Sequence, residues 1–373
     1  MIRRIGSVML MALVVSSCGG AGAPAPTTAL ATSSAQATSD PRLQAVIDAA
    51  KAEGAKLDLT WGSYANKDMV EQWKQGFERL YGIKPAVTLT PEPAMNQMAA
   101  KLVQEFKANR PASTDVFLST DVHILTLQTQ GPDMIQKVDW SWSKPISGTP
   151  KVVEGDGQAV HFVTTLRGIT YNADKVKGAD VPKSFADVLR LSTKYSVAST
   201  PQASVFETVS TPDIWGEQRT VQYITDLSKN IKGLIQGQEL NRISTGEFDI
   251  FLIDYGKNEV DTRKAQGQNL AWSFATDAPI VTPIYLSIPK NSAHPNMAKL
   301  WLSYVMSREA QDLLMKYEYL DNVMLPGSKN VEEIKKLDAA GVKYYQTSVE
   351  FAKKYTDNYT RVRTQLQKIL SKQ

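Results

Sequence analysis

The stretch LDLTWGSYANKDMVEQWKQGFERLYG, residues 57–82, decides the class of fold. Its first five residues, Leu57–Trp61, are typical of a buried strand, and the apolar residues between Val70 and Leu80 recur at the spacing of one helix face. Gly82 follows as a helix stop. A strand, a small polar loop and a helix in this order form the repeating unit of an α/β protein.

The same alternation of strand and helix continues along the chain. The pair Asp40-Pro41 predicts a helix start before the first strand. Further strands are expected at 86–89, 115–118, 160–165, 168–171, 195–198, 248–253 and 280–288. A long helical region is expected over 206–227 and an amphipathic helical tail over 331–370. The pattern predicts parallel strands joined by crossover helices.

The N-terminus carries an export signal that ends at a cysteine. Two arginines precede an apolar run from Ile5 to Val15, which is too short to span a bilayer. The residues Val-Ser-Ser before Cys18 resemble the lipobox of bacterial lipoproteins, so we expect residues 1–17 to be a signal peptide and Cys18 to be lipidated. The alternative is an ordinary signal peptide with an unrelated cysteine. Residues 18–40 are rich in Ala, Ser, Thr and Pro and are expected to form a flexible linker.

Composition and missing motifs exclude several classes of function. The formal net charge of +4 includes the two arginines of the signal, so the remaining body is close to neutral. Nothing in the charge pattern indicates nucleic acid or an anionic membrane surface as a partner. Cys18 is the only cysteine, so no intramolecular disulfide can form. The sequence lacks a hydrolase elbow, a zinc-binding helix and a phosphate loop, and His123, His161 and His294 fit no metal motif. We therefore expect that the protein is not an enzyme and that it binds no cofactor.

Six segments, in order, resemble the substrate-binding proteins of ATP-binding-cassette (ABC) importers, and the branch with ferric-iron-binding proteins most of all. They are LDLTWGSYANKD (57–68), DVFLSTD (115–121), LRGITYNADKV (166–176), PKSFADVL (182–189), TGEFDIFLI (245–253) and the run 288–314, which contains AHPN and SREAQ. The resemblance covers roughly residues 55–330.

The resemblance implies an α/β fold of the type II periplasmic binding protein class, in which two lobes, each a mixed sheet flanked by helices, are joined by two hinge strands. The expected boundaries are lobe one at 41–165 and 288–373, lobe two at 172–277, and the hinge strands at 166–171 and 278–287. His294 then belongs to the turn that starts a helix at Pro295, not to a metal site.

Ligands of open α/β sheets bind beyond the carboxyl ends of the strands, and small, polar or aromatic residues stand there in this sequence. The expected ligand-binding residues are Ser63, Tyr64, Thr120, Asp121, Arg167, Ser199, Thr200, Asp254 and Tyr255.

By the resemblance, Arg167 and the turn Ser199-Thr200-Pro201 occupy the places where the ferric branch holds a companion anion. Arginine grips carboxylates and phosphates with two parallel hydrogen bonds, so we expect a small organic anion as ligand. Trp61, Tyr64, Tyr255 or Tyr285 could stack against its organic part, although core packing suits Trp61 slightly better.

Ferric iron is the alternative ligand. The ferric branch binds the metal through two adjacent tyrosines, a histidine and a carboxylate, whereas here Tyr255 has no tyrosine neighbour. The histidine position falls near Tyr64-Ala65 and the carboxylate position near Thr120 and Asp121. Tyr64, Asp121 and Tyr255 are therefore an incomplete set of hard oxygen ligands.

The expected function is capture of a small solute outside the cytoplasmic membrane and its delivery to an ABC permease. Lobe closure on the ligand would be the mechanism. We expect a monomer, held by its lipid anchor in the periplasm or at the cell surface, that binds no nucleic acid. A ligand-sensing lipoprotein without a transport role is a further alternative, and an extracellular enzyme is a third.

Overall fold

The computed structural model describes residues 40–63, 65–91, 94–131, 133–253 and 256–372. The predicted signal peptide, the predicted lipidation site Cys18 and the predicted linker up to residue 39 lie outside the described residues. Within them, every helix is too short or too polar to cross a bilayer.

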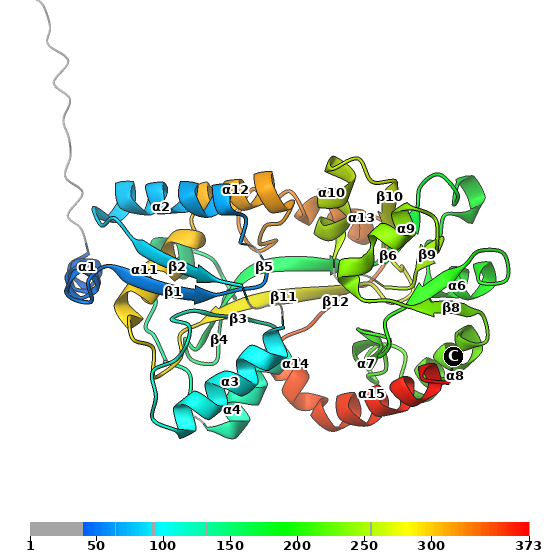
Figure 1. Cartoon of the computed structure of the whole chain (residues 1–373), viewed down its shortest axis with the longest axis horizontal. Coiled ribbons are helices and arrows are strands. Elements are labelled where there is room, and N and C mark those ends of the chain that lie inside the picture. The colour runs from blue at the N-terminus through cyan, green and yellow to red at the C-terminus, as the bar shows by residue number, and fades with distance from the viewer. Residues whose placement is uncertain (1–39, 64, 92–93, 132, 254–255, 373) are drawn as a thin grey trace, which may run out of the picture. The chain divides into compact units, whose positions relative to one another are not determined.

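The elements alternate along the chain (Figure 1). The first part contains α1 (Pro41–Ala52), β1 (Lys56–Thr60), α2 (Lys67–Tyr81), β2 (Ala86–Thr90), α3 (Met95–Lys107), β3 (Phe117–Ser119), α4 (Asp121–Gln130), α5 (Lys144–Ser147), β4 (Val153–Glu154) and β5 (Ala159–Arg167). The middle part contains β6 (Ile169–Asn172), η1 (Gly178–Asp180), α6 (Phe185–Leu191), β7 (Val197–Ser199), α7 (Phe206–Val209), α8 (Glu217–Ser228), β8 (Ile231–Leu234), η2 (Gly237–Glu239), α9 (Asn241–Ser244), β9 (Ile250–Phe251), α10 (Lys257–Ala265), β10 (Leu270–Ser273) and β11 (Ile280–Ser287). The last part contains α11 (Pro295–Val305), α12 (Arg308–Glu318), α13 (Val331–Ala339), β12 (Tyr345–Gln346), α14 (Val349–Lys354) and α15 (Thr356–Leu370).

Two large apolar clusters hold these elements. The first core is built around Trp73, Phe162 and Trp301, which are at most 2% exposed. The second core is built around residues such as Phe206 and Ile250, which are fully buried. The predicted α/β fold is confirmed, and it has two separate apolar cores.

The helix α2 shows how the sequence produces the first core. The Asn66 side chain accepts the backbone N–H groups of Asp68 and Met69, which would otherwise lack partners at the helix start. Gly82 ends the helix with φ at 64°, a conformation that glycine adopts without strain. The face between these ends buries Trp73, whose indole N–H donates to the carbonyl of Ala310 in α12.

Two long strands connect the two cores. β5 and β11 are antiparallel neighbours from Arg167 opposite Ile280 to Val160 opposite Leu286, and Figure 1 shows them running between the two groups of elements. β5 passes into β6 at Gly168, where an added Cβ would lie 2.4 Å from the carbonyl oxygen of Ser273. Only glycine fits this close approach, which lies where the chain passes from the sheet of β5 to the sheet of β6.

The strand directions differ from the parallel arrangement that the sequence predicts. One sheet has the order β12-β11-β5-β4 with β3 beside β11, and the other has the order β10-β6-β9-β7-β8. β5, β3 and β6 pair antiparallel with their neighbours, whereas β1–β2, β7–β8 and β7–β9 are parallel. Strands β8 and β10 have no counterpart in the prediction because they are short and half-exposed.

The C-terminal tail is not one amphipathic helix. Helix α13 ends before Gly341, whose φ is 67°, and the chain then adds β12 beside β11. We call residues 345–370 the C-terminal strap. The predicted helical region 206–227 is likewise interrupted, between α7 and α8, where Pro212 and Gly216 lie.

The strap also departs from the expectation that residues 288–373 all belong to lobe one. Helix α14 packs against α4, and Leu125, Ala352 and Tyr355 belong to one buried apolar cluster there. Helix α15 instead packs against α7 and α8, and its Val362 and Leu366 are fully buried in the second core.

Candidate ligand-binding site

The predicted site residue Ser63 and the stacking candidate Trp61 lie together in the first core. Ser63 follows β1 and is half-buried; it lines a small cavity together with Trp61 and with Leu118 of β3. Trp61 itself is 2% exposed, and its indole N–H donates to the carbonyl of Val116 at 2.9 Å. Trp61 is therefore a core residue, as its place in the predicted strand 57–61 suggested, although β1 itself ends at Thr60.

Thr120 begins helix α4 at the end of β3. Its hydroxyl lies 3.0 Å from Nδ1 of His123, and its backbone N–H faces the same nitrogen at 3.3 Å. This reciprocal contact caps the helix. Burial lowers the pKa of His123 to about 4, so the imidazole is neutral at physiological pH. Thr120 thus has a structural partner in addition to any ligand.

Asp121 is enclosed instead of facing an open cleft. It is 5% exposed, accepts the backbone N–H of Val122 at 2.9 Å, and lies beside the Thr347 hydroxyl of the C-terminal strap. Burial, with a smaller contribution from Glu154, raises the pKa of Asp121 to about 6. This carboxyl group contacts the strap, so it is poorly placed to bind an incoming solute or ferric ion.

Arg167 lies at the end of β5, where the chain leaves the first sheet. The guanidinium is half-buried, and its Nε donates to Thr282 Oγ1 of β11 at 3.4 Å. Its positive charge reaches Asp121 and lowers the pKa of that carboxyl group slightly. The structure therefore brings Arg167 and Asp121 to the same region between β5 and α4.

The second sheet places another predicted pair of residues at one edge. β7 and β9 are parallel and in register, with Ala198 opposite Phe251, so their carboxyl ends lie side by side. Ser199 is the last residue of β7 and Thr200 follows it, and both are fully buried. Thr200 Oγ1 accepts the backbone N–H of Ser204 at 2.8 Å, so the hydroxyl organises the loop before α7.

The exposed polar groups of that loop were missed by the sequence analysis. Gln202 and Ser204 are half-exposed and hydrogen-bond to each other at 2.9 Å. Ala203 and Val205 adopt φ angles of 47° and 76°, which are rare for residues with a Cβ and unusual for a β-branched one. A strained loop at a strand end is a frequent feature of binding sites, but no sequence pattern here indicates it.

The loop before α10 lies against the connecting strand β5. An added Cβ at Gly256, just before α10, would lie 3.3 Å from Cβ of Thr165 and 2.5 Å from Oδ1 of Asn258. Thr165 stands two residues before Arg167 on β5, so both side chains point to one face of the strand. The loop before α10 and Arg167 thus lie on the same part of β5.

Three predicted site residues, Tyr64, Asp254 and Tyr255, lie outside the described residues. Tyr285 was a candidate for stacking on a ligand, but it is fully buried and its hydroxyl donates to Glu154. It is a core residue.

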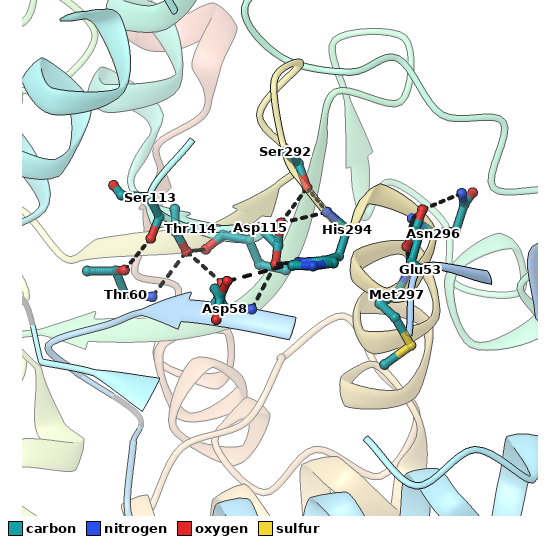
Figure 2. Close-up of polar contacts among 11 residues, drawn as sticks. Glu53, Asp58, Thr60, Ser113, Thr114, Asp115, Ser292, His294, Asn296 and Met297 are labelled. Atoms are coloured by element: carbon teal, nitrogen blue, oxygen red, sulfur yellow. Dashed lines mark hydrogen bonds and ion pairs between the residues drawn. The ribbon is translucent and has the colours of Figure 1, made fainter. Parts of the chain in front are cut away.

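One cluster of described residues combines the donor types of a metal site: Asp58, Asp115 and His294 (Figure 2). Asp115 is 1% exposed, and its Oδ2 lies 2.8 Å from His294 Nδ1 and accepts the backbone N–H of Asp58 at 2.8 Å. Its Oδ1 accepts from Ser292 Oγ and from the backbone N–H of His294. Both carboxylate oxygens are fully used, so the cluster clamps the start of α11 to β1.

Helix α11 begins at Pro295, as the sequence predicts. Figure 2 also shows Glu53, whose carboxylate accepts the backbone N–H groups of Asn296 and Met297. The predicted role of His294, as part of the turn that starts the helix at Pro295, agrees with this geometry.

Comparisons with known proteins agree with this architecture. The model of the family described as "Bacterial extracellular solute-binding protein" matches residues 72–346. A Fe(3+)-binding periplasmic protein of Serratia marcescens is 23% identical over 307 residues, which cover 79% of this chain and 87% of that protein.

Solved structures share the fold at low identity. The substrate-binding protein of an ABC transporter from Agrobacterium tumefaciens has a TM-score of 0.66 at 14% identity, covering 84% of this chain and 95% of that one. Iron-bound HitA from Pseudomonas aeruginosa has a TM-score of 0.64 at 16% identity, covering 82% and 99%. The fold implied by the sequence resemblance is confirmed. The chain belongs to the bacterial extracellular solute-binding protein family.

Proposed function

We propose that this protein captures a small organic anion outside the cytoplasmic membrane and delivers it to an ABC permease. Membership of the solute-binding family supports the capture step, and the A. tumefaciens structure belongs to such a transporter. A lipid on Cys18 would keep the receptor beside its permease and raise its local concentration. Sensing without transport would use the same capture step.

The observation that carries the choice of ligand class is the position of Arg167. It stands where β5 leaves the first core, on the strand face that the loop before α10 approaches at Thr165. A guanidinium at a junction between two cores can bind an anionic group while both cores close around the rest of the molecule. Ser63 and the Gln202–Ser204 loop supply further polar groups, one from each core.

Ferric iron is the second candidate, because relatives of this chain are described as iron-binding. Phenolate oxygens of Tyr64 and Tyr255 would be suitable hard ligands. Asp121, the third member of the expected set, is enclosed by the strap and adjoins Thr347. This enclosure favours the anion over the metal.

Isothermal titration of the purified chain with small carboxylates, phosphates, phosphonates, polyamines and ferric citrate tests the proposal. We expect an organic anion to bind, and Arg167→Gln to weaken it about 10- to 100-fold, since a charge-assisted hydrogen bond contributes roughly 1.5–3 kcal/mol. Arg190→Gln is the matched control, because Arg190 is exposed and pairs only with Asp187 among the ion pairs of the described residues. Tight ferric binding with no anion binding would overturn the proposal.

A further inference from the structure

One buried polar side chain next to β5 has an oxygen without a hydrogen bond. Asn258, the second residue of α10, is 5% exposed, and its Oδ1 has no hydrogen-bond partner among the residues that the structure describes. Buried polar atoms are nearly always paired, because an unpaired acceptor loses its hydration and gains nothing in return. The few exceptions need a physical explanation, and a group that binds there from outside the chain is one.

The Asn258 amide lies at the start of α10, against the connecting strand. Helix α10 packs on β5. The position that a Cβ would take at Gly256 lies 2.5 Å from Asn258 Oδ1 and 3.3 Å from Cβ of Thr165 on β5. The amide therefore turns back toward the helix start, and it borders the same small space as Thr165. This space exists because residue 256 is a glycine.

The start of α10 also offers backbone donors. Its N-cap is Gly256, which has no side-chain oxygen to accept the first backbone N–H groups of the helix. These N–H groups form the positive end of the helix dipole and favour an anionic group nearby. The buried Asn258 amide and the helix start thus present hydrogen-bonding groups at the same place, where the second core meets β5.

Arg167 lies within reach of this place. It stands two residues after Thr165 on β5, and alternate residues of a strand share one face. They are separated by about 7 Å along the strand. The Thr165 hydroxyl donates to the carbonyl of Thr282 at 3.0 Å, and the Thr282 hydroxyl accepts from Arg167 Nε at 3.4 Å, which fixes both side chains on β11. One small molecule can therefore contact the guanidinium of Arg167 and the amide of Asn258 together.

We propose that Asn258 is a ligand-binding residue and that the solute is an anion with a hydroxyl group beside its carboxylate or phosphate. Given the proposed solute-binding function, on which this assignment rests, Arg167 binds the anionic group and Asn258 Oδ1 accepts from the hydroxyl. An anionic oxygen cannot donate to Oδ1, so the unpaired acceptor requires a donor on the solute. A solute without the hydroxyl leaves this buried oxygen unpaired and is rejected.

Isothermal titration of the full chain with matched pairs of anions tests this assignment. The pairs are malate and succinate, citrate and tricarballylate, and glycerol phosphate and propyl phosphate. In the parent chain, the hydroxylated member of a pair should bind about tenfold or more tightly than its partner, because only that member pairs the buried acceptor. Asn258→Leu should remove this preference by weakening the hydroxylated member alone, whereas Arg167→Gln should weaken both members.

Asn269→Leu is the matched control, because Asn269 is an exposed asparagine before β10 of the same sheet, and it should keep the preference. Leucine has nearly the shape of asparagine and no polar atom, so Asn258→Leu should unfold thermally no earlier than the parent; Asn258→Ala is the second variant if it does. Equal binding of both members of each pair, or a preference that survives in the Asn258 variants, would overturn the assignment. Absence of binding by every anion would instead overturn the proposed function itself.

Discussion

Val349 at the start of α14 donates its backbone N–H to Glu154 Oε2 of β4 at 3.0 Å, which fastens the C-terminal strap to the first core. The other end of the strap is fixed to the second core. Arg363 of α15 pairs with Glu207 at 2.7 Å, and Lys354 pairs with Asp213 at 3.1 Å. The strap is therefore a third connection between the cores, besides β5 and β11.

The first prediction concerns the anchoring of α15. Leu366 is fully buried in the second core, so Leu366→Ala should lower the free energy of unfolding by about 2–5 kcal/mol. Gln367→Ala, one residue away on the exposed face, should change it by less than about 0.5 kcal/mol. Urea unfolding followed by circular dichroism measures both. Equal effects of the two variants would show that α15 does not pack on this core.

The second prediction uses the buried carboxyl group of Asp121. Its folded-state pKa of about 6 lies above the ordinary value of 3.8, so the folded state binds the proton more tightly than the unfolded chain. The stabilising effect is complete below pH 4 and is lost as the pH rises to about 6. Asp121→Asn removes this loss, so its stability relative to the parent should rise by about 3 kcal/mol between pH 4 and 7. Asp133→Asn, at an exposed position, should show a flat difference.

The third prediction, on the same helix, has the opposite sign. The pKa of His123 falls to about 4 in the folded protein, below the ordinary 6.5, so the unfolded chain binds this proton more tightly. The stabilisation is present above pH 6.5 and is lost as the pH falls toward 4. His123→Gln keeps a side chain suited to this capping position. Its stability relative to the parent should therefore increase on acidification by up to about 3 kcal/mol, as urea titrations at each pH would reveal. A difference that stays constant between pH 7 and 4 would contradict this.

The class of fold was predictable because its signals are local. The pattern from Leu57 to Gly82 gave β1 and α2 nearly to the residue, and the pair Asp40-Pro41 marked the start of α1. Strand direction was not predictable in this way, since the pairing of β11 with β5 joins residues more than a hundred positions apart. The helical tail is interrupted at Gly341, and the following residues pair as β12 with β11. This pairing is a contact between residues far apart in the sequence, so it could not be predicted from the local pattern either.

The candidate site was predictable only as a set of strand ends. Ser63, Thr120 and Thr200 do follow β1, β3 and β7, and Ser199 ends β7, but a strand end does not reveal which hydroxyl faces solvent. Thr200 is buried and its hydroxyl holds Ser204, whereas Gln202 and Ser204 are partly exposed. Asp121 could not be recognised as enclosed, because the strap that covers it comes from more than two hundred residues later.

The fourth prediction decides between a clamp and a metal site at Asp115. Removing His294 takes away one of the two side-chain groups bonded to the buried Asp115 carboxylate, the imidazole at 2.8 Å, so His294→Ala should cost about 1–3 kcal/mol of stability. Asp58→Asn should cost less than about 1 kcal/mol, because the Asp58 side chain is 50% exposed and only its backbone N–H is needed by Asp115. Thermal unfolding with and without EDTA should give the same midpoint for the parent chain. A midpoint that falls with EDTA and returns with added Zn²⁺ would instead identify Asp58, Asp115 and His294 as metal ligands, since metal bound only by the folded state stabilises it.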